Sequence, residues 1–426
     1  NMNISDRIKS AILSKVVEPK DRRIGVEEEC IIYTADLRRL PVNPCDEFSA
    51  SGLLISMNEN SHGNGIYTLE PGGQLEWSSP PYKNLNDLSN AFKRHRILLE
   101  LIATEHGLRI LDLGVEPNYV PDDIDLINQL KYQLMDKNME RRGTLGKWMM
   151  RNTASIQVNY DVTSAQDLEE MVFVADCLQP VCAYLFANSP FQNGKPVGKE
   201  NIRNVIWENT DESRCRNLID HGIDSPQGLI DKYIGYIMTV PGIFQLDENG
   251  EIEDTDQTLG ERLNEIDNLD QLRVDDIQAA LHQIFTNVRL KNLVEVRGAD
   301  RPPLDYEIAP VAFWTGLLTE KSVRDEVLSV VIKWPLNDRH DWNKAAYRLD
   351  SSQPGPDGKS YGEWNEWIGE MALKGLESRG LNESHLFQSF FNIVLEKGPF
   401  GFQTQRAFEL SDALLKDFIF ESETLA

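Results

Sequence analysis

Four short segments of the chain carry polar residues that could together bind a metal ion. They cover residues 23–34 (RIGVEEECIIYT), 74–78 (QLEWS), 154–161 (ASIQVNYD) and 293–300 (LVEVRGAD), and each is typical of a β-strand. Because side chains alternate along a strand, each segment places several of its polar residues on one face. The residues on these faces are Glu27, Glu29, Glu76, Gln157, Asn159, Glu295 and Arg297.

If the four faces meet, their carboxylates need a compensating charge. An ionised carboxylate that is buried without a partner costs several kcal/mol or more. Ligands that are all hard oxygens select Mg²⁺ or Mn²⁺ over zinc or copper, so the pattern predicts a magnesium or manganese site. Alternation alone also fits ordinary strands with one solvated face, and Glu295 with Arg297 also fits a plain surface ion pair. Glu28 takes the opposite face, where we expect it to be salt-bridged or at the rim.

The elements that would position these residues interleave without a βαβ rhythm or a fixed repeat, which predicts an α+β fold with a mainly antiparallel sheet. Helices are expected at residues 4–17, 84–107, 167–187 (with a kink at Pro180) and 310–332. Strands are expected at residues 23–34, 65–78, 109–117, 154–161 and 288–300. Residues 139–148 are expected to form a mobile loop, and residues 242–261 a hairpin followed by a surface loop. We expect residues 1–426 to form one catalytic domain whose C-terminal part, from about residue 342, is mostly helical.

The composition excludes several classes of partner. Asp and Glu total 68 against 43 Lys and Arg, so the formal net charge is −25. A surface of this charge repels nucleic acid and anionic lipid, and we expect neither nucleic acid nor a membrane as a partner. There is no run of about 18 apolar residues that could span a bilayer, and no secretory signal is expected at the N-terminus. The five cysteines form no CxxC pair, which predicts a reducing, cytoplasmic setting rather than a disulfide framework or a zinc site.

Three familiar kinds of functional motif are missing from the sequence. Residues 354–360 (PGPDGKS) end in a GKS triplet, but a phosphate-binding P-loop needs a glycine where Gln353 stands. The seven histidines show no metal-binding spacing, and there is no GxSxG nucleophile motif. If the protein uses ATP, it does so without a P-loop.

The chain carries a series of longer motifs that occur in one order. They are RIGVEEE (23–29), LEPGGQLEWS (69–78), MMRNTASIQVNYD (149–161), LFANSPF (185–191), IRNVIW (202–207) and VEVRGAD (294–300). Together they closely resemble the plant and proteobacterial type of glutamate–cysteine ligase. The resemblance is strong over about residues 20–320 and weaker through GLESRG at residues 375–380.

The resemblance implies a glutamine synthetase-like fold, in which an antiparallel sheet curves into a funnel or partial barrel with helices packed outside. It also implies an ATP- and Mg²⁺-dependent (or Mn²⁺-dependent) ligase. The γ-carboxylate of glutamate attacks the γ-phosphate of ATP, and the α-amine of cysteine then displaces phosphate from the acyl phosphate to give γ-glutamylcysteine. This chemistry fits the residues, because phosphoryl transfer depends mainly on positioning and charge neutralisation.

The resemblance assigns roles to individual residues. Glu295 and Arg297 are implied to act in catalysis, with Arg297 reaching the transferred phosphoryl group and, like Gln157, contacting the nucleotide. Residues implied to bind the substrate are Arg203, Arg151, Trp207 and Asn159. Residues implied to bind metal are Glu27, Glu29, Glu70, Glu76, Gln157 and Glu295. On sequence grounds alone Trp207 could equally be a packing residue and Arg151 part of a surface ion pair.

Some features depart from the family pattern and bear on the acceptor. Trp77 stands where relatives often have a smaller apolar residue, and residues 397–410 lack the expected C-terminal pattern. A γ-glutamyl ligase for another amino acid or amine therefore remains an alternative. A non-catalytic binding protein is a further alternative, which loss of the metal-binding carboxylates or of Arg297 would indicate, and all of these residues are present.

Overall fold

A central antiparallel sheet organises the structure, a computed structural model that describes residues 2–421. The strand order is β10-β11-β5-β1-β3-β2, with β4 also paired to β1, and the sheet does not close on itself. Two short hairpins, β6–β7 and β8–β9, lie outside this sheet. The strands are β1 (Ile24–Tyr33), β2 (Ile66–Leu69), β3 (Leu75–Ser78), β4 (Arg109–Leu111), β5 (Ser155–Tyr160), β6 (Phe191–Gln192), β7 (Lys195–Pro196), β8 (Gln245–Leu246), β9 (Ile252–Glu253), β10 (Val288–Leu290) and β11 (Val294–Asp300).

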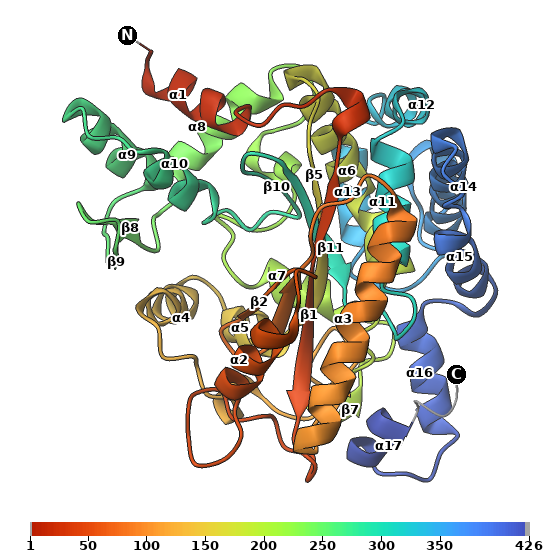
Figure 1. The fold of residues 1–426 in the computed structure, drawn as a ribbon. Coiled ribbons are helices and arrows are strands. Elements are labelled where there is room, and N and C mark those ends of the chain that lie inside the picture. The colour runs from red at the N-terminus through yellow and green to blue at the C-terminus, as the bar shows by residue number, and fades with distance from the viewer. Residues whose placement is uncertain (1, 422–426) are drawn as a thin grey trace.

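Helices cover the sheet and make up most of the C-terminal part (Figure 1). They are α1 (Ile4–Ile12), α2 (Ala50–Asn60), α3 (Leu85–His106), α4 (Leu130–Arg142), α5 (Gly146–Asn152), α6 (Ala165–Leu185), α7 (Ile202–Glu208), α8 (Leu229–Thr239), α9 (Leu259–Asn268), α10 (Val274–Leu281), α11 (Ala309–Leu318), α12 (Lys321–Val331), α13 (Leu336–Ala345), α14 (Tyr361–Arg379), α15 (His385–Lys397), α16 (Phe400–Glu409) and α17 (Leu415–Glu421). In Figure 1, α14 and α15 lie to one side of the sheet and α4 and α5 to the other. The expected α+β fold with an antiparallel sheet is confirmed.

One face of the sheet is apolar and forms the main core. Val26, Val158 and Val296 lie side by side across β1, β5 and β11, and all three are buried. Helix α6 packs against β11 and is buried along almost its whole length, which explains why most of its residues are apolar. Pro180 lies inside α6, as expected, and the Tyr361 hydroxyl donates to its carbonyl oxygen.

The predicted mobile loop at residues 139–148 is wrong, because helix α4 continues to Arg142 and α5 begins at Gly146, which leaves only residues 143–145 between them. Met135 and Met139 lie one helical turn apart and are buried, while the charged residues at positions 140–142 are exposed. The glycine at position 146 permits close packing, since a Cβ there would lie 2.4 Å from the Cβ of Met139. The charged residues concealed this apolar stripe in the sequence.

Several expected elements are interrupted by turns. The strand expected at residues 65–78 is the hairpin β2–β3, whose turn includes Gly73 at a φ of +81°. The strand at residues 288–300 is the hairpin β10–β11, and the helix at residues 310–332 divides into α11 and α12. The hairpin within residues 242–261 is present as β8–β9.

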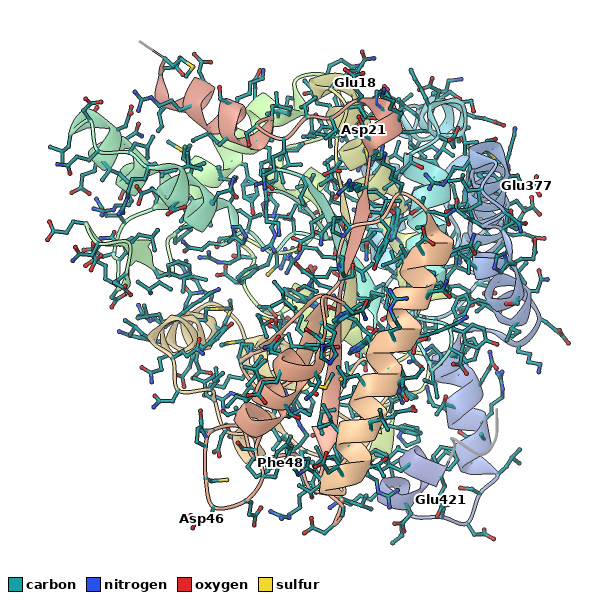
Figure 2. The ribbon with its side chains drawn as sticks, viewed as in Figure 1. Glu18, Asp21, Asp46, Phe48, Glu377 and Glu421 are labelled. Carbon is teal, nitrogen blue, oxygen red and sulfur yellow. The ribbon has the colours of Figure 1, made fainter. Side chains whose placement is uncertain are left out.

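The outside of the molecule carries acidic side chains around its periphery. Glu18, Asp46 and Glu377 are exposed and project outward in Figure 2. Within residues 2–421, no helix combines the length and the apolar character needed to cross a bilayer.

Candidate active site

The sheet brings the polar faces of four strands together. On β1, Glu29 is the register partner of Glu76 on β3, and Glu27 is the partner of Gln157 on β5. Glu295 on β11 pairs with Asn159, the next polar residue along β5. Alternation along each strand therefore places these side chains on one face, opposite the apolar core.

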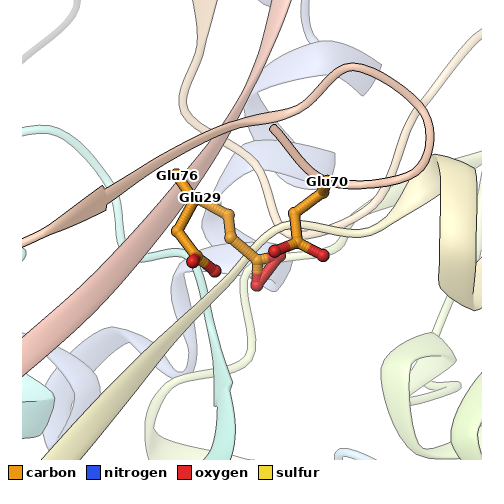
Figure 3. A group of neighbouring side chains, drawn as sticks. All are labelled: Glu29, Glu70 and Glu76. Carbon is orange, nitrogen blue, oxygen red and sulfur yellow. The ribbon is translucent and has the colours of Figure 1, made fainter. Parts of the chain in front are cut away.

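Three carboxylates meet at one end of this face and are called the acidic trio here. Glu29, Glu70 and Glu76 each offer an oxygen atom, and these atoms lie within 4.8 Å of one another. Figure 3 shows the three side chains converging from β1, the β2–β3 turn and β3. Buried Gln74 holds the turn in place, because its amide nitrogen donates to the carbonyl oxygens of Met150 and Thr153 at 3.0 Å.

The charges that act most strongly on each member of the trio are those of the other members. Burial, followed by the Glu76 charge, raises the pKa of Glu29 to about 8, although Ser155 Oγ donates to this carboxylate at 2.5 Å. Burial and the Glu29 charge raise the pKa of Glu70 to about 7. Burial and the Glu70 charge raise the pKa of Glu76 well above its ordinary value. The trio thus retains protons at neutral pH that a bound cation would displace.

A second oxygen-rich group lies beside the trio. The side-chain amide of Gln157 sits between the carboxylates of Glu27 and Glu295, and with its nitrogen turned toward them it donates to Glu27 Oε2 at 3.0 Å and Glu295 Oε1 at 2.9 Å. Burial, followed by the charges of Glu295 and Glu76, raises the pKa of Glu27 to about 8. The Oδ1 of Asn159, on the same strand, is buried without a hydrogen-bond partner.

Glu295 differs from the other carboxylates because three cations surround it. Arg289 Nε donates to its Oε2 at 2.6 Å, while Lys291 Nζ and Arg297 Nε lie 3.6 and 3.7 Å from its oxygens. Burial alone would raise the pKa of Glu295, but Arg289, Lys291 and Arg297 together hold it well below its ordinary value. This carboxylate is therefore ionised at neutral pH.

The predicted arginines line the edge of the same site. Arg297 lies where the pairing of β11 with β5 shifts register, and such a bulge redirects a side chain. Its guanidinium is 5.6 Å from the Trp207 ring centroid, and that of Arg203 is also 5.6 Å away. Burial and neighbouring Arg289 lower the pKa of Arg297 to about 10. The Nε of Arg297 and the Nε1 of Trp207 are buried without hydrogen-bond partners.

A cavity connects the acidic trio with these arginines. Its empty volume, counted together with its opening to solvent, is about 510 Å³. Its walls include Glu29, Glu70, Gln157, Arg203 and Arg297, with Trp207 and Phe285 as aromatic lining. Anionic and cationic groups thus face one space, as a site for a phosphorylated ligand and a metal requires.

Two residues discussed from the sequence lie elsewhere. The Arg151 guanidinium donates to Ile124 O at 2.9 Å and pairs with Asp136 Oδ1 at 2.7 Å, so it holds the 121–124 turn and α4 instead of lining the cavity. Glu28 is buried on the opposite face in an ion pair with Arg301, as expected. Burial alone would raise the pKa of Glu28, but Arg301 and His95 lower it to about 2.

Sequence reasoning missed the cations Arg289 and Lys291. Arg289 is the register partner of Glu295 in the β10–β11 hairpin, so recognising the turn at residues 291–293 would have placed it beside that carboxylate. It also missed the donor role of Ser155 toward Glu29, although the strand pattern does place Ser155 on the polar face.

The donor groups fit a hard divalent cation. The acidic trio offers only carboxylate oxygens, and their raised pKa values show that the protein itself supplies little compensating positive charge. Mg²⁺ and Mn²⁺ prefer such ligands. Glu29, Glu70 and Glu76 would hold one ion, and Glu27 and Glu295 offer further carboxylate oxygens on either side of the Gln157 amide.

Comparisons with known proteins give consistent matches. The family model for glutamate-cysteine ligase family 2 matches residues 23–390. The chloroplastic glutamate–cysteine ligase of Medicago truncatula is 32% identical over 342 residues, which is 78% of this chain and 65% of that protein. The Arabidopsis thaliana enzyme of the same name is 31% identical over 335 residues, covering 78% of this chain and 64% of that protein. The chain thus spans about 65% of the length of the relatives it matches.

Solved structures share the fold at low sequence identity. A glutamate–cysteine ligase from Francisella tularensis, in complex with AMP, superposes with a TM-score of 0.56 at 13% identity, covering 95% of this chain and 88% of that one. A bifunctional glutathione synthetase from Pasteurella multocida gives a TM-score of 0.51 at 13% identity, covering 98% of this chain and 52% of that one.

The predicted cytoplasmic setting is wrong by comparison with the plant relatives, which are named as chloroplastic enzymes. The prediction rested on the cysteines, and all five of them are free in the structure. Unpaired cysteines indicate a reducing environment, which does not distinguish the cytoplasm from another reducing compartment.

Proposed function

The chain belongs to glutamate-cysteine ligase family 2, and from this premise we propose that it is an ATP- and Mg²⁺-dependent ligase. It would join the γ-carboxylate of L-glutamate to the α-amine of L-cysteine through a γ-glutamyl phosphate, giving γ-glutamylcysteine. The observation that carries the proposal is the convergence of Glu29, Glu70 and Glu76 beside a cavity that also exposes Arg203 and Arg297.

The site has the charges that this reaction needs. A carboxylate is a poor electrophile, and phosphorylation gives it a leaving group. Two anions, the substrate carboxylate and the γ-phosphate of ATP, must then approach each other, so their repulsion has to be offset. Bound Mg²⁺ would neutralise charge on the phosphates and orient them.

The residues of the chain divide this work. The acidic trio, and beside it Glu27, Gln157 and Glu295, would hold the metal ions. Arg297 would bind the transferred phosphoryl group, because its planar guanidinium can donate to two oxygens at once and its Nε is without a hydrogen-bond partner.

Arg203 would bind a carboxylate of glutamate at the cavity wall. Its guanidinium lies near the Trp207 ring and is mostly shielded from water, which strengthens its attraction for an anion. Trp207 would complete the wall between the two arginines. The buried arrangement would also protect the acyl phosphate from hydrolysis until the acceptor amine attacks it.

We further propose that the described residues act as one catalytic unit. A continuous hydrophobic core runs from Ile8 in α1 to Val394 in α15 and includes the apolar face of the central sheet.

Phosphate release from ATP tests the proposal. We expect release that requires Mg²⁺ and L-glutamate and rises on adding L-cysteine, with a product of the mass of γ-glutamylcysteine. Phosphate release that requires glutamate but does not change on adding cysteine would indicate that the acceptor is another amine. The absence of glutamate-dependent release from a chain that binds ATP would contradict the ligase assignment.

A further inference from the structure

The segment LFANSPF (185–191) takes no part in the site described above, yet it contacts a buried carboxylate at the edge of that site. The backbone N–H of Asn188 and the hydroxyl of Ser189 both donate to Asp300 Oδ2, each at 2.9 Å. Asp300 is the last residue of β11 and of the VEVRGAD motif, and it is 3% exposed. One of its two oxygens is therefore firmly held.

The other oxygen of this carboxylate faces Arg203. Asp300 Oδ1 has no hydrogen-bond donor and lies 3.9 Å from Arg203 Nε. Arg203 is itself 6% exposed, and its Nη2 donates to the carbonyl oxygen of Arg297 at 2.9 Å. Residues from three sequence motifs are thus in contact: Ser189 of LFANSPF contacts Asp300 of VEVRGAD, and Asp300 faces the guanidinium of Arg203 of IRNVIW.

The Asp300 side chain has little freedom to turn away. A Cβ at Gly114 would lie 2.7 Å from Asp300 Cγ, so the backbone of that residue packs directly against the carboxylate. The separation of 3.9 Å is too long for a hydrogen bond but well within the range of a strong charge interaction in a buried site. Asp300 can therefore attract Arg203 without using up the N–H groups that a ligand would need.

We propose that Asp300 is a positioning residue that aims the Arg203 guanidinium at the carboxylate of the bound amino-acid donor. The inference rests on the proposed function, in which Arg203 binds glutamate. Asp300 would fix the guanidinium plane, and the carbonyl oxygen of Arg297 would fix its far end. The glutamate-binding and phosphoryl-binding arginines would thus keep a constant spacing.

The substitution Asp300→Asn tests this role. The asparagine oxygen can still accept from Asn188 and Ser189, but its NH₂ group would then face the Arg203 guanidinium, donor against donor. We expect KM for glutamate to rise about 10-fold while KM for ATP changes less than about 2-fold. Combined with Arg203→Lys, the effects should be strongly non-additive, because both changes disrupt the same contact.

Asp176→Asn provides a matched control. Asp176 is a buried carboxylate that accepts from two backbone N–H groups and faces Arg339, but this pair lies between α6 and α13, away from the cavity. The control should lower the unfolding temperature without a selective change in KM for glutamate. If Asp300→Asn behaves like the control, its role is structural and the proposal is overturned.

Two further outcomes are decisive. If Asp300→Asn does not fold, Ser189→Ala replaces it. Removing one of the two donors to Oδ2 should raise KM for glutamate about 3-fold with KM for ATP unchanged, and an unchanged KM for glutamate would overturn the proposal. If the unsubstituted chain neither releases phosphate with glutamate nor binds glutamate in calorimetry, the proposed function and this inference both fail. An active chain whose Asp300→Asn variant keeps its KM for glutamate overturns this inference alone.

Discussion

Adding Mg²⁺ to the metal-free protein should release protons from the acidic trio, in an amount set by pH. With a pKa of about 8, Glu29 is about 90% protonated at pH 7, and Glu70, with a pKa of about 7, is about half protonated. Because a metal ligand must be ionised, binding at pH 7 should release about 1.4 protons from these two residues, and Glu76, whose pKa is also raised, adds to this number. At pH 9 the same sum falls to about 0.1.

Calorimetry in two buffers with different ionisation enthalpies measures this release directly. Glu29→Gln should lower it by at least about 0.9 protons at pH 7, because the change removes the Glu29 proton together with the Glu29 charge that raises the pKa of Glu70. Glu18→Gln changes an exposed carboxylate far from the trio and should leave it unchanged. Release that is independent of pH, or below about 0.3 protons at pH 7, would refute the electrostatic account of the trio.

The same raised pKa values fix how stability depends on pH. The native state holds a proton on Glu29 between the ordinary pKa of 4.5 and about 8, whereas the unfolded state does not, so stability falls as pH rises through this window. For Glu29 the full loss is about 5 kcal/mol above pH 8. Mg²⁺ should therefore raise the unfolding temperature more at pH 8.5 than at pH 6.

Three other changes have defined outcomes. Arg297→Lys should lower kcat for phosphate release at least about 100-fold with the fold intact, because the charge remains but the planar two-point contact is lost. Arg289→Met should cost about 3 kcal/mol in denaturant unfolding, because it removes the 2.6 Å partner of buried Glu295. Gly298→Ala should cost about 2 kcal/mol, because its Cβ would lie 2.0 Å from Gln179 Nε2, and Gln179→Ala should restore most of that loss.

The controls for these variants are simple. Arg38→Met removes an exposed ion pair with Asp36 and should lower the free energy of unfolding by less than about 1 kcal/mol. If Arg289→Met lowers it by no more than this, the buried pair stabilises the fold no better than an exposed one. Wild-type kcat in Arg297→Lys would remove this arginine from the phosphoryl-binding role. If the double variant Gly298→Ala, Gln179→Ala stays as destabilised as Gly298→Ala alone, the Gln179 side chain is not the source of the clash.

The acidic face could be predicted because its signal is local. Alternation along β1 assigns Glu27 and Glu29 to one face and Glu28 to the other, and this assignment does not depend on the rest of the fold. The apolar neighbours of these residues identify the strand itself. The same argument places Gln157 and Asn159 on the polar face of β5.

The rest of the site depends on contacts that are distant in sequence or set by turns. Arg289 meets Glu295 only through the register of a hairpin, and Asp300 meets Arg203 across 97 positions of the chain, from Arg203 to Asp300. Arg151 shows the converse case, because its motif position suggests substrate binding whereas its guanidinium contacts local carbonyl oxygens and Asp136. The partner that each of these side chains contacts is set by tertiary packing, which cannot be read from a single sequence.

The central claim is tested most directly by mass analysis of the product formed from ATP, Mg²⁺, L-glutamate and L-cysteine. The account predicts one γ-glutamylcysteine for each phosphate released, and loss of both when Mg²⁺ is removed. Phosphate release without any γ-glutamyl product, or turnover that is unaffected by removing Mg²⁺, would contradict it.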